Sequence, residues 1–144
     1  MPFILRKGRA SVEYYTRKES VTYTAGDLVY HLQSDPGYAI PGDSTSGNHF
    51  GVMLGGIDNT AANFAYTNEK IAVLVPSEGA IFEADVSGTL ATTKVGEYWD
   101  LSYAGTVNAA ATAKVVVLCV GYISATKGLF KINATAYNAH VTTT

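Results

Sequence analysis

The sequence is short of cysteine and of long apolar segments, and each shortage excludes a class of protein. A single cysteine, Cys119, rules out an internal disulfide in the 144-residue chain. It lies in the apolar run KVVVLCVGY, where we expect a buried structural side chain, because a reactive thiolate needs a cationic, partly exposed pocket. No segment approaches the roughly 20 apolar residues that span a bilayer, so we expect no membrane association.

Charge is also scarce. Charged residues make up only 15% of the chain, against about 25% in ordinary globular domains, while hydrophobic residues make up 47%. Because so few charges cannot cover the surface of a small domain, much of the exterior must be Thr, Ser, Ala, Asn and Tyr. Such a surface favours packing against copies of the chain or against a partner.

The charges that are present are unevenly distributed. Residues 1–20 hold five basic and two acidic side chains, whereas the remainder holds five basic and ten acidic ones. The net charge of −2 argues against nucleic-acid binding as the main function. The start lacks the apolar region of a signal peptide, so we expect synthesis in the cytoplasm without export by that route. This basic segment fits an extended N-terminal arm, and its alternating pattern fits a first strand equally well.

Apolar residues alternate with a period of two through most of the chain, which is typical of β-strands. The pattern predicts strands at residues 11–16, 27–33, 50–55, 70–76, 80–86, 97–103, 114–123, 128–133 and 134–141. We therefore predict an all-β fold, an antiparallel β-barrel or β-sandwich, with residues 1–20 as arm or first strand and residues 21–144 as a single domain. No internal repeat is evident. Short helical turns are expected at residues 59–66 and 89–96, the second capped by Thr89 and ended by Gly96.

Glu83 and Asp85 are the main candidates for catalysis among the acidic residues. Strict alternation places Phe82, Ala84 and Val86 on the core side of a strand and the two acids on its solvent side. Two solvated carboxylates lack the burial that separates the pKa values of an acid–base pair. We interpret them as part of a solvated face, and a small hydrolase that uses either acid is a third hypothesis.

The remaining polar residues match no catalytic or metal-binding motif, so we expect no cofactor and no metal. His31, His49 and His140 lack the spacing of a ligand set, and His31 is expected to point outward from a strand. The letters SGNH at Ser46 to His49 are interpreted as coincidence, because the esterase family of that name draws these residues from separate sequence blocks. Trp99 and the ten tyrosines could line a sugar-binding platform, but cross-strand pairing explains them more simply.

Three segments in order are typical of one group of β-rich proteins. They are GDLVY at residues 26–30, FEADVSGTLATTKVGEYWDL at residues 82–101, and the C-terminal succession VNAA, LCVGY and KGLFKIN. With these segments the chain resembles the decoration, or cement, proteins of tailed-bacteriophage heads. The resemblance spans roughly residues 25–141 and concerns strand and turn types rather than a signature of chemistry.

The resemblance implies a non-enzymatic virion protein that stabilises the head shell. It implies many copies on the outer capsid surface, often as trimers, bound to the major capsid protein. An N-terminal arm with basic and tyrosine side chains would supply the contacts. The expected capsid contacts are Phe3, Arg6, Lys7, Arg9, Tyr14 and Tyr15. A head-fibre base, neck or tail protein is an alternative virion role, and a glycan-binding β module is an alternative of another class.

Overall fold

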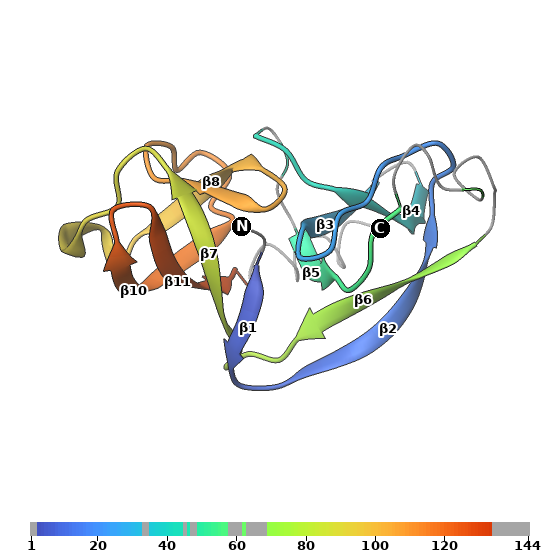
Figure 1. Ribbon diagram of the computed structural model, residues 1–144, viewed down its shortest axis with the longest axis horizontal. Helices are drawn as coiled ribbons and strands as arrows, with labels where there is room; N and C mark the ends of the chain where they lie inside the picture. Colours follow the sequence, from blue (N-terminus) through green and yellow to red (C-terminus); the bar gives the residue numbers. More distant parts are fainter. Residues whose placement is uncertain are drawn as a thin grey trace.

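The computed structural model describes residues 3–32, 35–44, 46, 49–57, 62 and 69–133. Nearly all regular structure in this part of the chain is β-strand, which confirms the predicted all-β fold. None of the described residues form a helix with the length and hydropathy needed to cross a membrane. The strands form two barrels that lie side by side (Figure 1).

The first barrel closes in the order β2-β4-β3-β5-β6. Its strands are β2 (Ala10–Arg17), β3 (Leu28–Leu32), β4 (Asp35–Pro41), β5 (His49–Met53) and β6 (Lys70–Pro76). Neighbouring strands are antiparallel, except that β2 and β4 are parallel. The apolar cluster inside it is formed by Tyr23, Val29, Ala39, Phe50, Met53, Ile71 and Val73.

The second barrel is built from the last five strands. These are β7 (Ile81–Ser87), β8 (Tyr98–Tyr103), β9 (Thr106–Asn108), β10 (Val117–Ser124) and β11 (Lys127–Ile132). They pair in the order β7-β11-β10-β8-β9, and a parallel pairing of β7 with β9 closes the ring. A further strand, β1 (Ile4–Lys7), pairs with the first half of β7.

The two barrels have the same topology. Taken in chain order, the strands β2 to β6 correspond to β7 to β11, with the first and third strands parallel in each ring. The expectation that the chain contains no repeat is therefore wrong at the level of structure. The repeat is hidden in the sequence because matching connections differ in length. Residues 54–69 join the last two strands of the first barrel, whereas residues 125–126 suffice in the second.

A shared apolar core joins the barrels. Leu28 and Val52 of the first barrel belong to the same buried cluster as Phe82 and Phe130 of the second. The main chain contributes as well, because the Leu28 N–H donates to the carbonyl oxygen of Ala104 at 2.8 Å. The two rings therefore pack against each other through this cluster, while the first barrel also keeps an inner cluster of its own.

Of the two alternatives expected for residues 1–20, an extended arm or a first strand, the structure shows strands over most of residues 4–17. Phe3 is only 3% exposed, and its ring meets that of Phe82 edge to face at 6.4 Å between centroids. The following residues form β1 and β2, with the turn at Gly8 between them. Leu5 of β1 packs against the buried cluster, and β1 pairs with β7, so burial of apolar surface favours a strand over a free arm.

One of the two expected helical turns lies in the described part of the chain. It is a 3₁₀ turn at Thr92–Lys94, with Gly96 in the left-handed region as predicted, at a φ of 91°. Ala91, not Thr89, occupies the position before it, and no side chain caps it. The expected turn at residues 59–66 and the expected strand at residues 134–141 fall outside the described residues.

Candidate functional site

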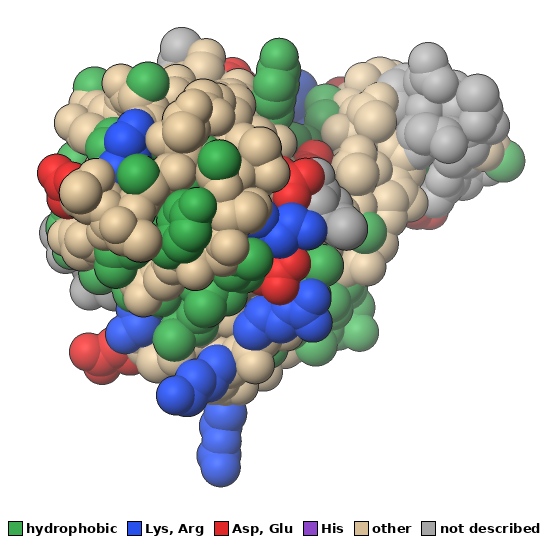
Figure 2. All heavy atoms as spheres, turned by 60° about the vertical axis from the view of Figure 1, so that its left-hand side comes forward, with side chains coloured by type: hydrophobic (Ala, Val, Ile, Leu, Met, Phe, Trp, Pro, Cys, Tyr) green, Lys and Arg blue, Asp and Glu red, His purple; other side chains and the backbone are tan. Residues whose placement is uncertain are grey.

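Four charged side chains form a row across β1, β7 and β11, called the charge row below. Arg6 Nε lies 3.0 Å from Glu83 Oε1. Lys127 Nζ lies 3.6 Å from Glu83 Oε2 and 3.9 Å from Asp85 Oδ1. Basic and acidic side chains alternate on this side of the molecule (Figure 2). The pairing of β11 with β7 places Lys127 directly opposite Asp85, whereas Arg6 reaches Glu83 from the irregular end of β1.

Both carboxylates of the charge row are paired with cations, so Glu83 and Asp85 do not form the pair of free acids that acid–base catalysis would need. The prediction that Phe82, Ala84 and Val86 face the core is confirmed, since all three are buried. The prediction that Glu83 faces water needs correction, because its side chain is only 15% exposed beside Arg6 and Lys127. Ion pairs at a surface contribute about 0–1 kcal/mol each, so the row adds little stability and mainly fixes the charge pattern of this face.

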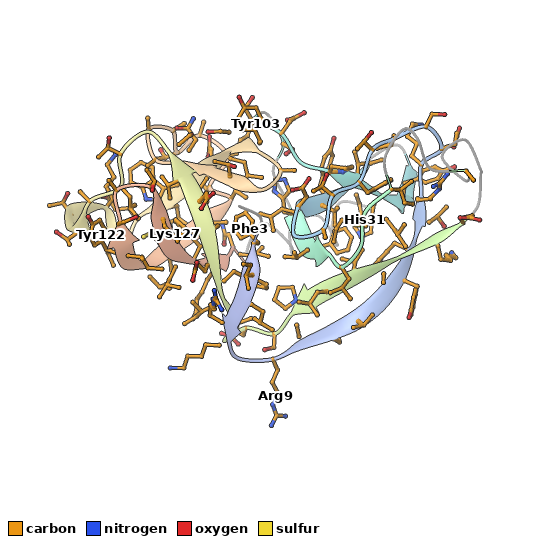
Figure 3. All side chains as sticks on the ribbon, viewed as in Figure 1. Phe3, Arg9, His31, Tyr103, Tyr122 and Lys127 are labelled. Atoms are coloured by element: carbon orange, nitrogen blue, oxygen red, sulfur yellow. The ribbon has the colours of Figure 1, made fainter. Side chains whose placement is uncertain are left out.

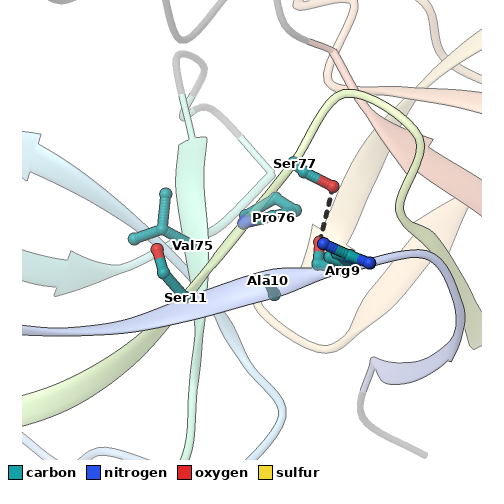
Figure 4. Close-up of a pocket in the computed structure, with 6 residues that line it drawn as sticks. All are labelled: Arg9, Ala10, Ser11, Val75, Pro76 and Ser77. Atoms are coloured by element: carbon teal, nitrogen blue, oxygen red, sulfur yellow. Dashed lines mark hydrogen bonds between the residues drawn. The ribbon is translucent and has the colours of Figure 1, made fainter.

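An open groove lies where the chain passes between the barrels, called the corner groove below. Its volume is about 280 Å³, and it is lined by Arg9, Ala10, Ser11, Val75, Pro76 and Ser77 (Figure 4). The Ser77 hydroxyl donates to the carbonyl oxygen of Arg9 at 2.7 Å and holds the two strands together there. The Arg9 side chain points away from both barrels (Figure 3). The lining of the corner groove is therefore mixed, with three apolar residues, two serines and one exposed cation.

The six predicted contact residues separate into an exposed and a buried group. Lys7 and Arg9 are exposed, Tyr14 is 68% exposed, and the Arg6 side chain is 52% exposed. Phe3 lies in the core, which excludes it as a surface contact. Tyr15 faces the interior of the first barrel and packs edge to face on Phe50, with 4.7 Å between centroids. The prediction is therefore corrected for Phe3 and Tyr15.

His31 does not point outward as expected. Its ring stacks on that of Phe50 with centroids 4.0 Å apart and planes parallel within 1°, and Tyr15 meets it edge to face. Its Nδ1 lies 3.2 Å from the carbonyl oxygen of Tyr38. His31 is therefore part of the aromatic packing of the first barrel.

Ser46 and His49 form a contact that sequence reasoning dismissed. Ser46 Oγ lies 2.8 Å from His49 Nε2, and both side chains are buried. Burial lowers the pKa of His49 to about 4, although nearby Asp43 acts in the opposite direction. The imidazole is therefore neutral at pH 7. The spacing of three residues in a Gly/Ser-rich loop was the available signal, since such hydroxyls often bond within their own turn.

The Ser46–His49 pair holds a turn. The Ser46 hydroxyl accepts from the N–H of Asp43 at 2.8 Å and lies 3.0 Å from its carbonyl oxygen. A catalytic base is normally oriented by a third group, but His49 Nδ1 is buried and has no hydrogen-bond partner among the described residues. Gly42 packs so closely on His49 that a Cβ there would lie 2.3 Å from Nε2. This geometry stabilises the loop that leads into β5.

Trp99 does not form the exposed platform that sugar binding would need. It is 8% exposed, its Nε1–H donates to the carbonyl oxygen of Lys94 at 3.3 Å, and the Lys94 ammonium lies 5.1 Å from the ring centroid. Among the aromatic residues on the surface are Tyr98, Tyr103 and Tyr122, which are 40%, 72% and 43% exposed. Tyr103 and Tyr122 lie far apart on the ribbon rather than side by side (Figure 3).

Cys119 is fully buried, as predicted. Burial raises the pKa of its thiol, and its Sγ lies 3.5 Å from the carbonyl oxygen of Gly121. Within the described ranges there is no cluster of three His, Cys, Asp or Glu side chains suited to a metal ion. The surface features described above are therefore the charge row, the corner groove and scattered exposed apolar side chains.

Comparison with models of known protein families finds no match to this chain. Comparison with curated proteins finds no match either. The function must therefore be inferred from the sequence pattern and from the surface itself.

Proposed function

We propose that this protein is a non-enzymatic capsid decoration protein that binds the outer surface of a phage head shell. The observation that carries the proposal is an exterior with few charges and many exposed apolar side chains. Exposed large hydrophobic residues occur on both barrels: Val12, Tyr14, Leu54, Val95, Tyr98, Tyr103, Val115, Tyr122 and Ile123. On the face drawn in Figure 2, hydrophobic side chains are spread between tan surface, which is backbone and other side chains, and a few charges.

Scattered contact residues suit binding by many copies. Each exposed side chain alone contributes weak affinity, and an oligomer that engages several sites at once gains avidity without any new contact. We propose a homo-oligomer, with a trimer favoured by the resemblance to decoration proteins. In this role the protein belongs to the virion, on the outside of the capsid, with no nucleic acid or membrane as partner.

The proposed partner is the major capsid protein, and the proposed contact lies at the exposed members of the predicted set. Arg6, Lys7 and Arg9 lie close together in the chain on β1 and the turn that follows it, and Tyr14 follows on β2. Arg6 is already paired with Glu83, so Lys7 and Arg9 are the cations left to meet an acidic capsid surface, with the exposed Tyr14 ring beside them along the chain. Charge complementarity there governs orientation and the rate of association.

A charge reversal at Lys7 tests this contact. Lys7→Glu is expected to lower co-sedimentation with undecorated shells severalfold, because it places an acid in the basic segment. Lys114→Glu, at an exposed lysine of the second barrel, is the matched control and should bind like the unmodified protein. Equal binding of all three proteins would overturn the assigned contact, and failure of the unmodified protein to bind would overturn the function.

Copy number separates decoration from the alternative virion roles. A decoration protein is expected in many copies on each particle, whereas a neck, tail or head-fibre base protein is present in a few. Quantitative gel analysis of purified particles against the major capsid protein would decide between them. A glycan-binding module is the weaker alternative, because Trp99 is buried.

A further inference from the structure

The strand β2 has one open edge. On one side it pairs with β6 from Ala10 to Thr16. On the other side only Thr16 and Arg17 are paired, in parallel with Tyr38 and Ala39 of β4. No other strand among the described residues pairs with the first half of β2, so its second edge is open there.

Alternate residues of β2 direct their main chain to this open edge. The N–H of Ser77 donates to Arg9 O, and the N–H of Arg17 donates to Glu69 O, both at 2.9 Å. These contacts show that the odd-numbered residues of β2 bond to β6. Since the pattern alternates along an antiparallel ladder, Ala10, Val12 and Tyr14 turn their N–H and C=O groups toward the open edge.

The second barrel shows that this edge is a place for a strand. In the first barrel, Arg17 of β2 pairs with the buried Ala39. In the second, Val86 of β7 pairs with the buried Val107. Superposing these two pairs aligns β2 with β7. In this alignment the first half of β7 carries β1, with Ile4 opposite Glu83. The same edge of the first barrel carries no strand from the described residues.

The open edge lacks most of the features that usually prevent pairing between molecules, and its one charged residue is Glu13. Edge strands are normally protected by Pro, by Lys or by a β-bulge. Residues 10–14 read ASVEY, and the pairing of this segment with β6 is regular. Val12 is 49% exposed and Tyr14 is 68% exposed, so apolar side chains also flank the edge.

We propose that this edge binds the same edge of a second copy of the chain, antiparallel, with Ser11 on the two-fold axis. In this register Ala10 lies opposite Val12 of the second copy. The N–H and C=O groups that these residues direct toward the open edge can then bond to each other. Arg9 lies opposite Glu13 of the second copy, and the symmetric pair repeats the contact. The segment is therefore complementary in charge to itself, which selects a second copy as the occupant.

The contact is small, and a small contact has consequences for assembly. A few hydrogen bonds and two exposed ion pairs only partly offset the entropy lost on association, so the pair forms weakly in dilute solution. It gains strength where copies are already held close together, as on a surface with many copies. A two-fold contact of this kind pairs each copy with one other copy, and in the proposed oligomer on a shell it would join neighbouring oligomers.

A disulfide at the symmetry axis tests the register. Ser11→Cys is expected to give a covalent dimer on oxidation, because facing residues of an antiparallel pair lie within disulfide range. The native Cys119 is buried and does not compete. Tyr14→Cys is the control: it is more exposed, yet the two Tyr14 positions lie about 20 Å apart in this register. Equal cross-linking of both variants, or none with Ser11→Cys, would overturn the proposal.

Charge exchange tests the occupant. In the Ser11→Cys background, Arg9→Glu and Glu13→Arg should each reduce dimer formation severalfold, because like charges then face each other. Mixing these two variants should restore it as a heterodimer, which a mass tag on one chain identifies. Melting curves of each variant confirm that it is folded. Equal dimer yields in all of these variants would contradict the proposed pairing, and this result would not depend on whether the protein binds a capsid.

Discussion

At the scale of single residues, burial assigns Phe3 to the core rather than to a partner. The side chain is 3% exposed and packs on Phe82. Phe3→Ala is therefore expected to lower the free energy of unfolding by about 3–5 kcal/mol, measured by chemical denaturation. Tyr14→Ala, which truncates an exposed ring, should change it by less than about 0.5 kcal/mol. Equal effects of the two substitutions would show that Phe3 is not a core residue.

His49 predicts a dependence of stability on pH. Burial lowers its pKa in the folded state to about 4 from an ordinary value of 6.5. As the pH falls, the unfolded chain takes up this proton first, so the stabilising contribution is complete above pH 6.5 and is lost toward pH 4. The loss amounts to about 3 kcal/mol. Denaturation curves at pH 7 and pH 4.5 measure it.

The His49→Gln variant isolates this contribution. Other groups titrate in the same range, so only the difference between the two proteins reports on His49. The variant should be less stable at pH 7, because a buried contact is lost, and its stability should vary less between pH 7 and pH 4.5. An identical pH dependence in both proteins would rule out a buried neutral His49.

Single-residue environments were predictable where alternation alone decides them. Phe82, Ala84 and Val86 were assigned correctly because a regular strand turns every second side chain inward. The environments of His31 and Trp99 were not predictable. His31 stacks on Phe50, which comes from another strand. Trp99 donates to Lys94 in a turn whose shape the local pattern does not specify.

At the scale of elements, the corner between β1 and β2 depends on Gly8. Its φ is 87°, and a Cβ there would lie 2.7 Å from the carbonyl oxygen of Gly79. Gly8→Ala should therefore destabilise the protein by about 1–3 kcal/mol in thermal or chemical unfolding. Gly79→Ala is the matched control, because nothing lies within 4 Å of its added Cβ. Comparable stability of the two variants would contradict this corner geometry.

Most strands were predictable from period and turn residues, but three were missed. β4 was missed because its segment contains Pro36, Gly37 and Pro41, which indicate turns rather than a strand. β9 has three residues, too few to show a period. β1 was interpreted as an arm because Arg6 and Lys7 follow a short apolar start, and its pairing with β7 is a contact across most of the sequence.

At the scale of the whole molecule, the chain is two barrels of one topology around a shared core. The repeat could not be predicted, since it resides in strand order and not in residue identity. The exposure of Lys7, Arg9 and Tyr14 agrees with their place in a polar, alternating segment, whereas the open edge of β2 became visible only by comparing the two barrels. The exposed side chains and the open edge both lie on the outside of the molecule, as the proposed role in binding a shell and other copies requires.

The most direct test of this account is imaging of shells mixed with the purified protein. Shells assembled without it should be incubated with increasing amounts and examined by cryo-electron microscopy. The account predicts added density that saturates and occupies equivalent positions over the outer surface, with two-barrel units resolved in it. Shells that remain bare at saturating protein, or density confined to a single vertex or tail, would contradict capsid decoration.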